Sequence, residues 1–220
     1  MKKPRALDLF CGAGGVTRGL QLAGFHVTGV DIRPQPRYVG DAFIQGNALD
    51  VDTEGYDFIW ASPPCQAFTM LRHMPTARMH PNLIPQTRRK LVAAGVPWVI
   101  ENVPGAPLHN PVMLCGTMFD LACDRGELRR HRLFESHGFT LVAPRRACHH
   151  SRLTIAVYGH AGGVENRKKN STPRSHSWER REVMEIDWMT VEQLSQAIPP
   201  AYSQFIGQQA MAKLALEMEA

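Results

Sequence analysis

The sequence predicts an α/β protein with an open, mostly parallel β-sheet and helices on both faces. Short runs of apolar and β-branched residues alternate along the chain with segments of helical periodicity, which is the pattern of βαβ units. The first of these runs leads into a glycine-rich turn. This combination is typical of a strand that brings a nucleotide-binding loop to the carboxyl edge of such a sheet.

The composition indicates one soluble domain. The chain has 220 residues, 44% of them apolar, which is enough for one sizeable core over residues 1–220 and marginal for two. Its apolar runs are far shorter than a membrane span, and Met1-Lys2-Lys3-Pro4 leads directly into a strand-like run without the apolar stretch of a signal peptide. We therefore predict a cytoplasmic protein with no membrane contact, and no obligate protein partner is evident. Five cysteines, an odd number, favour free thiols over a disulfide framework.

The first βαβ unit is predicted near the N-terminus. A strand over 6–10 is followed by the turn Cys11-Gly12-Ala13-Gly14-Gly15, a helix over 16–23 and a second strand over 26–30 that ends at Asp31. Glycines let backbone amides approach a ligand, and an acid in this position can accept hydrogen bonds from ribose hydroxyls. The turn lacks the third glycine of the dinucleotide-binding fingerprint GxGxxG, which argues against a nucleotide-dependent oxidoreductase.

A cysteine follows the next predicted strand, over 56–61. It stands in Ser62-Pro63-Pro64-Cys65-Gln66, where a strand ends and a loop begins, the usual position of a nucleophile in an open α/β sheet. The two prolines stiffen the turn before Cys65. Taken alone, the segment fits a buried, unreactive thiol in an ordinary loop equally well.

An acid ends the strand that comes after. A helix is predicted over 82–95 and a strand over 98–100, which leads into Glu101-Asn102-Val103-Pro104. Because parallel strands end at the same edge of a sheet, we expect Glu101 to lie on the same edge as Cys65 and Asp31. The alternative is a structural carboxylate that pairs with an arginine or a helix terminus.

Two arginines alternate in the segment 126–134. If Arg130 and Arg132 enter one strand, both side chains lie on one face, where two guanidinium groups usually bind an anion or a carboxylate. Further along, a strand is predicted over 154–158, and a capping box at Thr190 begins a helix that ends at Ile198.

A last helix is predicted over 201–218, after Pro199-Pro200. The net charge is +5, which is compatible with a nucleic-acid partner without requiring one. The segment 162–182 is predicted to be a mobile basic loop that either contacts phosphates or is simply solvated. Its basic residues are Arg167, Lys168, Lys169, Arg174, Arg180 and Arg181.

A zinc site is a weaker hypothesis. Its candidate ligands are Cys115, Cys123, Cys148, His149 and His150. Their spacing contains no Cys-x-x-Cys pair, so the sequence favours no metal here and leaves the question open.

Four segments together resemble the DNA cytosine C5-methyltransferase family. They are Asp8-Leu9-Phe10-Cys11-Gly12-Ala13-Gly14-Gly15, Pro63-Pro64-Cys65-Gln66, Glu101-Asn102-Val103 and Arg130-His131-Arg132, in family order over roughly residues 5–135. The segment Ile198–Gly207 resembles the last family motif in weakened form, with Gln208 where asparagine is usual. The resemblance implies a Rossmann-like class I methyltransferase fold, S-adenosylmethionine as cofactor and DNA as substrate.

The resemblance also implies the roles of individual residues. The Cys65 thiolate, on a turn that includes Pro64, would attack C6 of a cytosine flipped out of the duplex. Glu101 would act at N3 and at the exocyclic amine, and Arg132, with Arg130 beside it, would steady O2 of the base and Glu101. The implied cofactor contacts are Asp8, Phe10, Cys11, Gly12, Gly14, Gly15, Asp31, Ile32, Asn47, Ala48, Pro63 and Leu83.

The region for target recognition is short. The family normally inserts a large recognition region after the Arg-x-Arg segment, whereas only residues 136–189 are available here. We expect short or relaxed specificity, supplied in part by loops such as 160–182, in a stand-alone enzyme of the phage or prophage kind. The alternatives are the same chemistry on RNA or a free cytosine nucleotide, and a catalytically inactive DNA-binding relative. The intact Cys65, Glu101 and Arg132 argue against inactivity.

Overall fold

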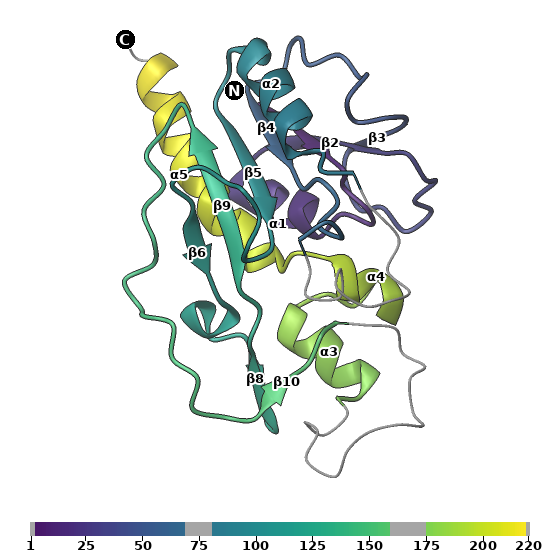
Figure 1. The fold of residues 1–220 in the computed structure, drawn as a ribbon, viewed down its shortest axis with the longest axis vertical. Helices are drawn as coiled ribbons and strands as arrows, with labels where there is room; N and C mark the ends of the chain where they lie inside the picture. The colour runs from purple at the N-terminus through teal and green to yellow at the C-terminus, as the bar shows by residue number, and fades with distance from the viewer. Residues whose placement is uncertain (1–2, 69–80, 159–174, 219–220) are drawn as a thin grey trace.

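The computed structural model describes residues 3–68, 81–158 and 175–218 (Figure 1). Its centre is a seven-stranded sheet in the order β3-β2-β1-β4-β5-β9-β6. Strands β1 to β5 are parallel to one another, and β9 runs antiparallel between β5 and β6. The strands are β1 (Arg5–Leu9), β2 (His26–Asp31), β3 (Ala42–Gln45), β4 (Phe58–Ala61), β5 (Trp98–Asn102), β6 (Val112–Leu114) and β9 (Arg132–His137). The predicted mostly parallel sheet is confirmed.

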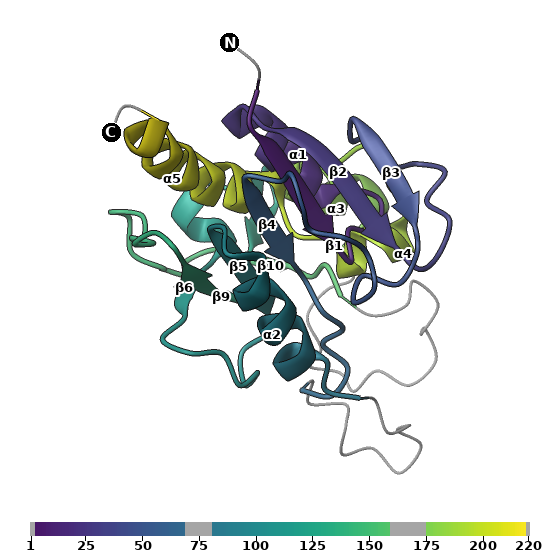
Figure 2. The ribbon, with the colours of Figure 1, turned by 90° about the horizontal axis from the view of Figure 1, so that it is seen from above.

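Helices cover both faces of this sheet, as predicted. In Figure 2, α2 lies on the opposite side of the sheet from α1 and α5. Alternation along β4 explains the two layers, because Phe58 and Trp60 join the core beneath α1 and α5, whereas Ile59 and Ala61 join the core that contains Leu91 of α2. The three helices are α1 (Gly15–Ala23), α2 (Ile84–Ala94) and α5 (Pro200–Met218).

The first and last helices pack unusually closely. A Cβ atom added to Gly19 would lie 2.1 Å from the Pro200 carbonyl oxygen, and one added to Gly15 would lie 2.5 Å from the Ile198 carbonyl oxygen. Only glycine permits this approach of the two backbones. The C-terminal motif is thereby placed directly against the helix that follows the glycine turn.

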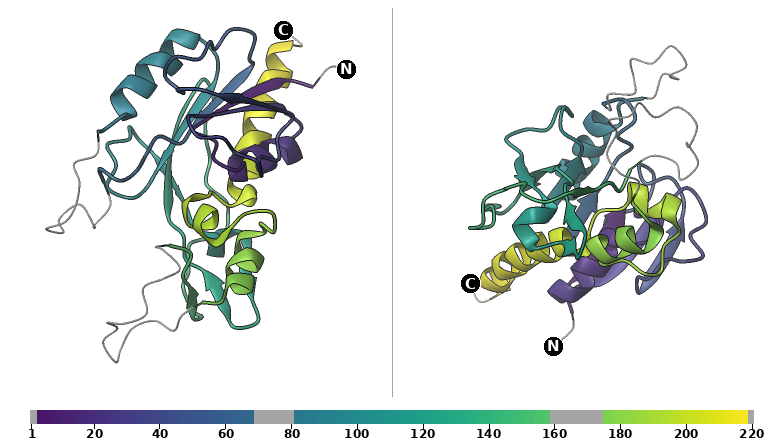
Figure 3. Two further views of the ribbon diagram at one scale, coloured as in Figure 1. Left: turned by 90° about the vertical axis from the view of Figure 1, so that its right-hand side faces the viewer. Right: turned by 90° about the horizontal axis from the view of Figure 1, so that it is seen from below.

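A smaller sheet lies beyond the carboxyl edge of the main one, beside α3 (Figures 1 and 3). Its order is β10-β8-β7, and the short helix η2 precedes it in the chain. The remaining elements are η2 (Gly116–Phe119), β7 (Ala122–Cys123), β8 (Gly126–Leu128), β10 (Thr154–Ile155), α3 (Ser177–Met184) and α4 (Val191–Gln196). None of the helices in the described ranges is both long enough and apolar enough to cross a membrane.

Three sequence-based assignments need correction. The two arginines do not share a strand, because β8 ends at Leu128 and β9 begins at Arg132, which leaves Arg130 between them. The strand predicted over 154–158 is only Thr154–Ile155. The helix predicted from residue 82 begins at Ile84. The capping box at Thr190 is confirmed, since its hydroxyl accepts from the Gln193 amide at 3.2 Å.

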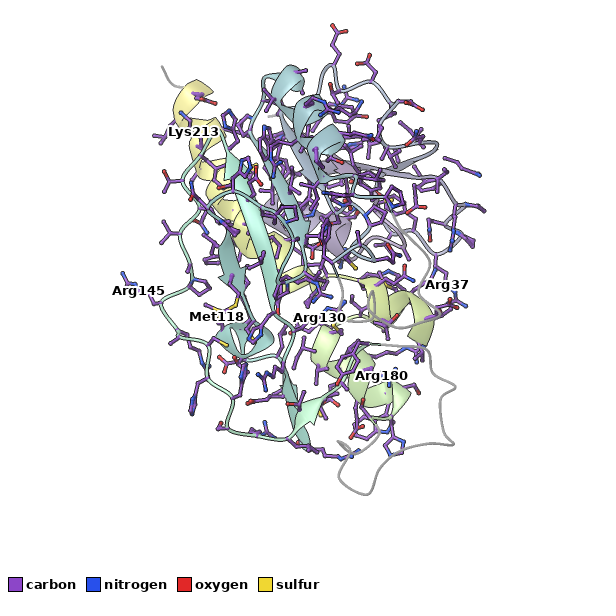
Figure 4. All side chains as sticks on the ribbon, in the orientation of Figure 1. Arg37, Met118, Arg130, Arg145, Arg180 and Lys213 are labelled. Atoms are coloured by element: carbon purple, nitrogen blue, oxygen red, sulfur yellow. The ribbon has the colours of Figure 1, made fainter. Side chains whose placement is uncertain are left out.

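The described end of the basic segment 162–182 is helical. Residues 159–174, with Arg167, Lys168, Lys169 and Arg174, lie outside the described residues. Its last part forms α3, where Glu179 is fully buried and pairs with Arg125 at 2.9 Å. Arg180, labelled in Figure 4, is 8% exposed, and Arg181 donates to the Met189 carbonyl oxygen. The end of the segment is therefore a packed helix rather than a solvated loop.

Candidate active site

Four neighbouring parallel strands, β2, β1, β4 and β5, bring the predicted site residues to one edge of the sheet. Asp31 ends β2, the glycine turn follows β1, the loop with Cys65 follows β4, and Glu101 lies next to the end of β5. The Ser62 amide donates to the Leu9 carbonyl oxygen at 3.1 Å, so the Cys65 loop starts beside the glycine turn. The shared edge predicted for these residues is confirmed.

The glycine turn has an uncommon backbone conformation. Phe10 has φ 63°, Gly12 has φ 51° and Gly14 has φ 89°, all in the left-handed region. Such a conformation is costly for phenylalanine, and residues of this kind concentrate at ligand sites. The Gly12 amide donates to the Asp31 carboxylate at 3.0 Å, and the Trp188 indole donates to the Ala13 carbonyl oxygen at 2.9 Å. The turn is thus fixed from both sides.

The other residues predicted to contact a cofactor fall into exposed and buried groups. Ile32 is 70% exposed, an unusual position for an isoleucine, and it follows Asp31 directly. Asn47 is exposed, its amide oxygen accepts from the Leu49 amide, and its amide nitrogen donates to Asp50. Ala48 is buried. Among the rest, Cys11 and Pro63 are buried, Gly15 is covered by the C-terminal segment and Leu83 is half-buried before α2.

Asp8 lies behind the glycine turn. Its side chain is fully buried, and one carboxylate oxygen accepts from the Thr17 hydroxyl at 2.6 Å. Burial raises the pKa of the Asp8 carboxyl from its ordinary value of 3.8 to about 7, although the hydrogen bonds from Thr17 oppose the shift. The structure therefore shows a role in holding α1 to β1, and a direct cofactor contact stays a prediction.

We expect Asp8→Asn to flatten the dependence of stability on pH. From about pH 4 to about pH 7 the folded protein keeps a proton on Asp8 that the unfolded chain has released, so the free energy of unfolding falls as the pH rises and levels off above about 7. The full shift corresponds to about 4 kcal/mol. Urea unfolding at pH 5 and pH 8 measures the change in the free energy of unfolding between these two pH values. The control Asp52→Asn changes an exposed acid and should keep the wild-type dependence of the free energy of unfolding on pH. If Asp8→Asn also kept that dependence, the raised pKa would be wrongly assigned to Asp8.

Glu101 and Arg132 form an ion pair at the centre of the half of the site that is predicted to be catalytic. The Arg132 Nε atom lies 3.2 Å from the Glu101 Oε1 atom, and the Glu101 side chain is 7% exposed. Cys65 is half-buried, and burial together with the charge of Glu101 raises the pKa of its thiol, against the opposing charges of Arg132 and Arg130. Burial likewise raises the pKa of Glu101, against the same arginines. The charges of Glu101 and Arg132 thus both act on the Cys65 thiol.

Two supporting side chains, Ser62 and Asn102, were not assigned roles from the sequence. The Ser62 hydroxyl hydrogen-bonds to Glu101 and accepts from the Trp60 indole at 3.0 Å, so its own proton is directed at the carboxylate. The Asn102 amide donates to the Pro63 carbonyl oxygen at 2.9 Å, which fixes the loop before Cys65 to the end of β5. Pro64 is exposed, next to the thiol. Ser62 and Asn102 belong to the segments that contain Cys65 and Glu101, but the sequence does not reveal which residues they contact.

Arg130 is placed differently from the expectation. Figure 4 shows it where the main sheet meets the C-terminal elements, and it is 4% exposed. Its guanidinium group donates to the carbonyl oxygens of Val157, Ser195 and Ala197, while its own carbonyl oxygen accepts from the Tyr202 hydroxyl at 2.7 Å. These bonds tie the arginine segment to the C-terminal motif. Arg130 therefore holds the backbone beside Arg132, and its contact with a substrate stays a prediction.

Solved structures with the same fold were found by comparison. The chain matches a DNA modification methyltransferase encoded within an E. coli prophage, at TM-score 0.63 and 13% identity over 96% of this chain and 99% of that one. It matches the S. pombe Dnmt2 methyltransferase at TM-score 0.59 and 14% identity over 98% and 99%. For the Entamoeba histolytica methyltransferase EhMeth the values are 0.53 and 12% over 99% and 99%.

No protein-family model and no curated protein sequence matches the chain. At such low identities the structural likeness concerns the fold. The mostly parallel seven-stranded sheet with helices on both faces is consistent with the fold of these neighbours. The chain has the Rossmann-like α/β fold of class I methyltransferases.

Proposed function

We propose that this protein transfers a methyl group from S-adenosylmethionine to C5 of cytosine in DNA, as a short stand-alone enzyme of the phage kind. One observation carries the proposal. Cys65, Glu101 and Arg132 meet at the same sheet edge as the glycine turn and Asp31, with Glu101 paired to Arg132 and near enough to Cys65 to raise its pKa. A thiol nucleophile, a carboxyl group of raised pKa and a fixed cation are what C5 methylation of a pyrimidine requires.

The turn after β1 fits the cofactor. A Cβ atom added to Gly12 would have no described atom within 4 Å, so this side of the turn is open, and the exposed Ile32 offers an apolar surface next to it. The Asp31 carboxylate accepts from the Gly12 and Arg33 amides and retains further acceptor capacity for ribose hydroxyls. S-adenosylmethionine, when bound, supplies the electrophilic methyl group.

The protein's own groups activate the base. Cytosine C5 is a poor nucleophile, and attack of the Cys65 thiolate on C6 breaks the conjugation of the ring and makes C5 enamine-like. Electron density then moves toward N3, where Glu101 delivers a proton, and its raised pKa keeps that proton available. Arg132 holds the Glu101 carboxyl in place and can bind O2 of the base. Once C5 carries the methyl group, loss of the C5 proton to solvent, return of the N3 proton to Glu101 and elimination of the Cys65 thiolate restore the aromatic ring.

The substrate must expose C6, which is shielded inside a duplex. We infer that the enzyme acts on a cytosine flipped out of the stack. The net charge of +5 supports a polyanionic partner. Only residues 138–176 separate β9 from α3. This short connection supports recognition of a short DNA sequence by loops around the carboxyl edge, in place of a separate recognition domain.

Methyl transfer from labelled S-adenosylmethionine tests the proposal. Duplex DNA, transfer RNA and dCMP are offered in parallel, and the product is digested and separated into nucleosides. We expect label in 5-methylcytosine from duplex DNA. Label only from transfer RNA or dCMP would keep the chemistry and replace the substrate, whereas label on adenine or on N4 of cytosine, or no transfer at all, would refute the proposed function.

A further inference from the structure

Four side chains with metal-binding atoms converge beside the arginine segment. The ligand atoms of Cys115, His131, Cys148 and His150 all lie within 4.8 Å of one another. The Nε2 atom of His150 lies 3.3 Å from the Cys115 sulfur and 3.2 Å from the Cys148 sulfur, and the Nε2 atom of His131 lies 3.3 Å from the Cys148 sulfur. From this convergence we propose that the protein binds one structural Zn²⁺ ion through these four residues.

Hydrogen bonding alone accounts poorly for the cluster. A neutral imidazole nitrogen offers either one lone pair or one proton, so Nε2 of His150 cannot make two full hydrogen bonds with two sulfurs. A cation in the middle receives one lone pair from each atom and removes the conflict. Two thiolates also neutralise a divalent ion, which lets the site lie in the protein with Cys115 fully buried.

The chemistry and the dimensions favour zinc. Two sulfur and two imidazole ligands are a usual donor set for tetrahedral zinc, with Zn–S near 2.3 Å and Zn–N near 2.0–2.1 Å, which places the ligand atoms about 3.3–3.8 Å apart. The three sulfur–nitrogen distances are close to this range. Because all four positions are filled by the protein, none is open for a substrate, so the ion is structural rather than catalytic.

The ligands come from three separate segments. Cys115 follows β6 and His131 precedes β9, and these two strands are paired through Leu114 and Arg132. Cys148 and His150 lie in the stretch 138–153, which contains no helix or strand. A zinc ion would fasten this long connection to the main sheet, where a crosslink is most effective. It would also fix the residue next to Arg132. The inference stands without the proposed function, since it uses only this cluster.

The metal content of the wild-type chain is the first test. Protein purified without chelator is analysed by elemental mass spectrometry, and we expect about one zinc per chain, as for closed structural sites. Metal-free protein titrated with Co²⁺ should develop the intense visible bands of a tetrahedral thiolate complex, which Zn²⁺ then abolishes. Removal of the metal should lower the melting temperature, because the ion binds only the folded chain. A protein that contains no zinc and develops no cobalt bands would overturn the proposal. A disulfide between Cys115 and Cys148 would overturn it as well.

Two matched pairs of variants locate the site. His150→Asn and Cys148→Ser should hold less than about a tenth of an equivalent of zinc, because a site that loses one of four ligands binds far more weakly. The controls are His149→Asn, an exposed neighbour of His150, and Cys123→Ser, a buried cysteine outside the cluster. Both controls should retain one zinc. If His150→Asn retains zinc as His149→Asn does, the ligands are assigned wrongly.

Discussion

Cys65→Ala should lose methyl transfer by at least about 10⁴-fold, the scale on which removal of a covalent nucleophile acts. Binding of S-adenosylmethionine should be unchanged, because the glycine turn and Asp31 belong to β1 and β2 and make their own hydrogen bonds. Cys65→Ser should fail as well, since an alcohol is a far weaker nucleophile than a thiolate at neutral pH. Transfer of labelled methyl groups and calorimetric titration with the cofactor measure the two effects separately.

A covalent trap tests the role of Cys65 as the nucleophile by a second method. DNA that contains 5-fluorocytosine has no removable proton at C5, so the enzyme should remain attached to it through Cys65 and migrate with it on a denaturing gel. Cys123→Ala offers a matched control, because Cys123 is buried in β7 of the small sheet and should keep both turnover and adduct formation. Turnover near that of the wild type in Cys65→Ala would show that another group is the nucleophile.

Local patterns in the sequence were sufficient for the central elements. The strand, glycine turn and helix of the first unit are specified by neighbouring residues, and the structure places them within a residue of the prediction. Strand β3 was missed because it lies at the edge of the sheet and its side chains are mostly exposed, which leaves no alternating pattern. Helix α3 was missed because its first turn is charged, although Val183 and Met184 pack into the core and Glu179 pairs with Arg125.

The candidate site shows the same division. The positions of Cys65 and Glu101 could be predicted because both residues lie where a parallel strand ends, and such ends share one edge of the sheet. The role of Arg130 could not, since its partners are backbone carbonyl groups far away in the sequence. His131 escaped notice as a metal ligand for a similar reason. The four zinc ligands come from three segments, so no short spacing motif reveals them.

Glu101→Gln should lower the rate of methyl transfer by about 10² to 10⁴-fold, the usual contribution of a positioned proton donor. Glutamine cannot deliver a proton to N3, although its amide keeps much of the shape of the protonated carboxyl group. The substitution should leave stability nearly unchanged, because the raised pKa of Glu101 shows that the folded protein already disfavours its charge. Single-turnover transfer and thermal unfolding measure the two properties.

Glu135 provides the matched control for this prediction. It is a buried acid on the neighbouring strand, paired with Arg88 at 2.7 Å through two hydrogen bonds. Burial alone would raise the pKa of Glu135, but the hydrogen bonds from Arg88 and from the His109 amide, together with the charge of Arg88, lower it overall. Its charge therefore stabilises the fold, so Glu135→Gln should melt at a lower temperature while the folded enzyme keeps its rate. Opposite effects of two similar substitutions would separate chemistry from packing. If Glu101→Gln instead lost stability and kept its rate, Glu101 would be a structural partner of Arg132, and proton delivery to the base would have to come from another group.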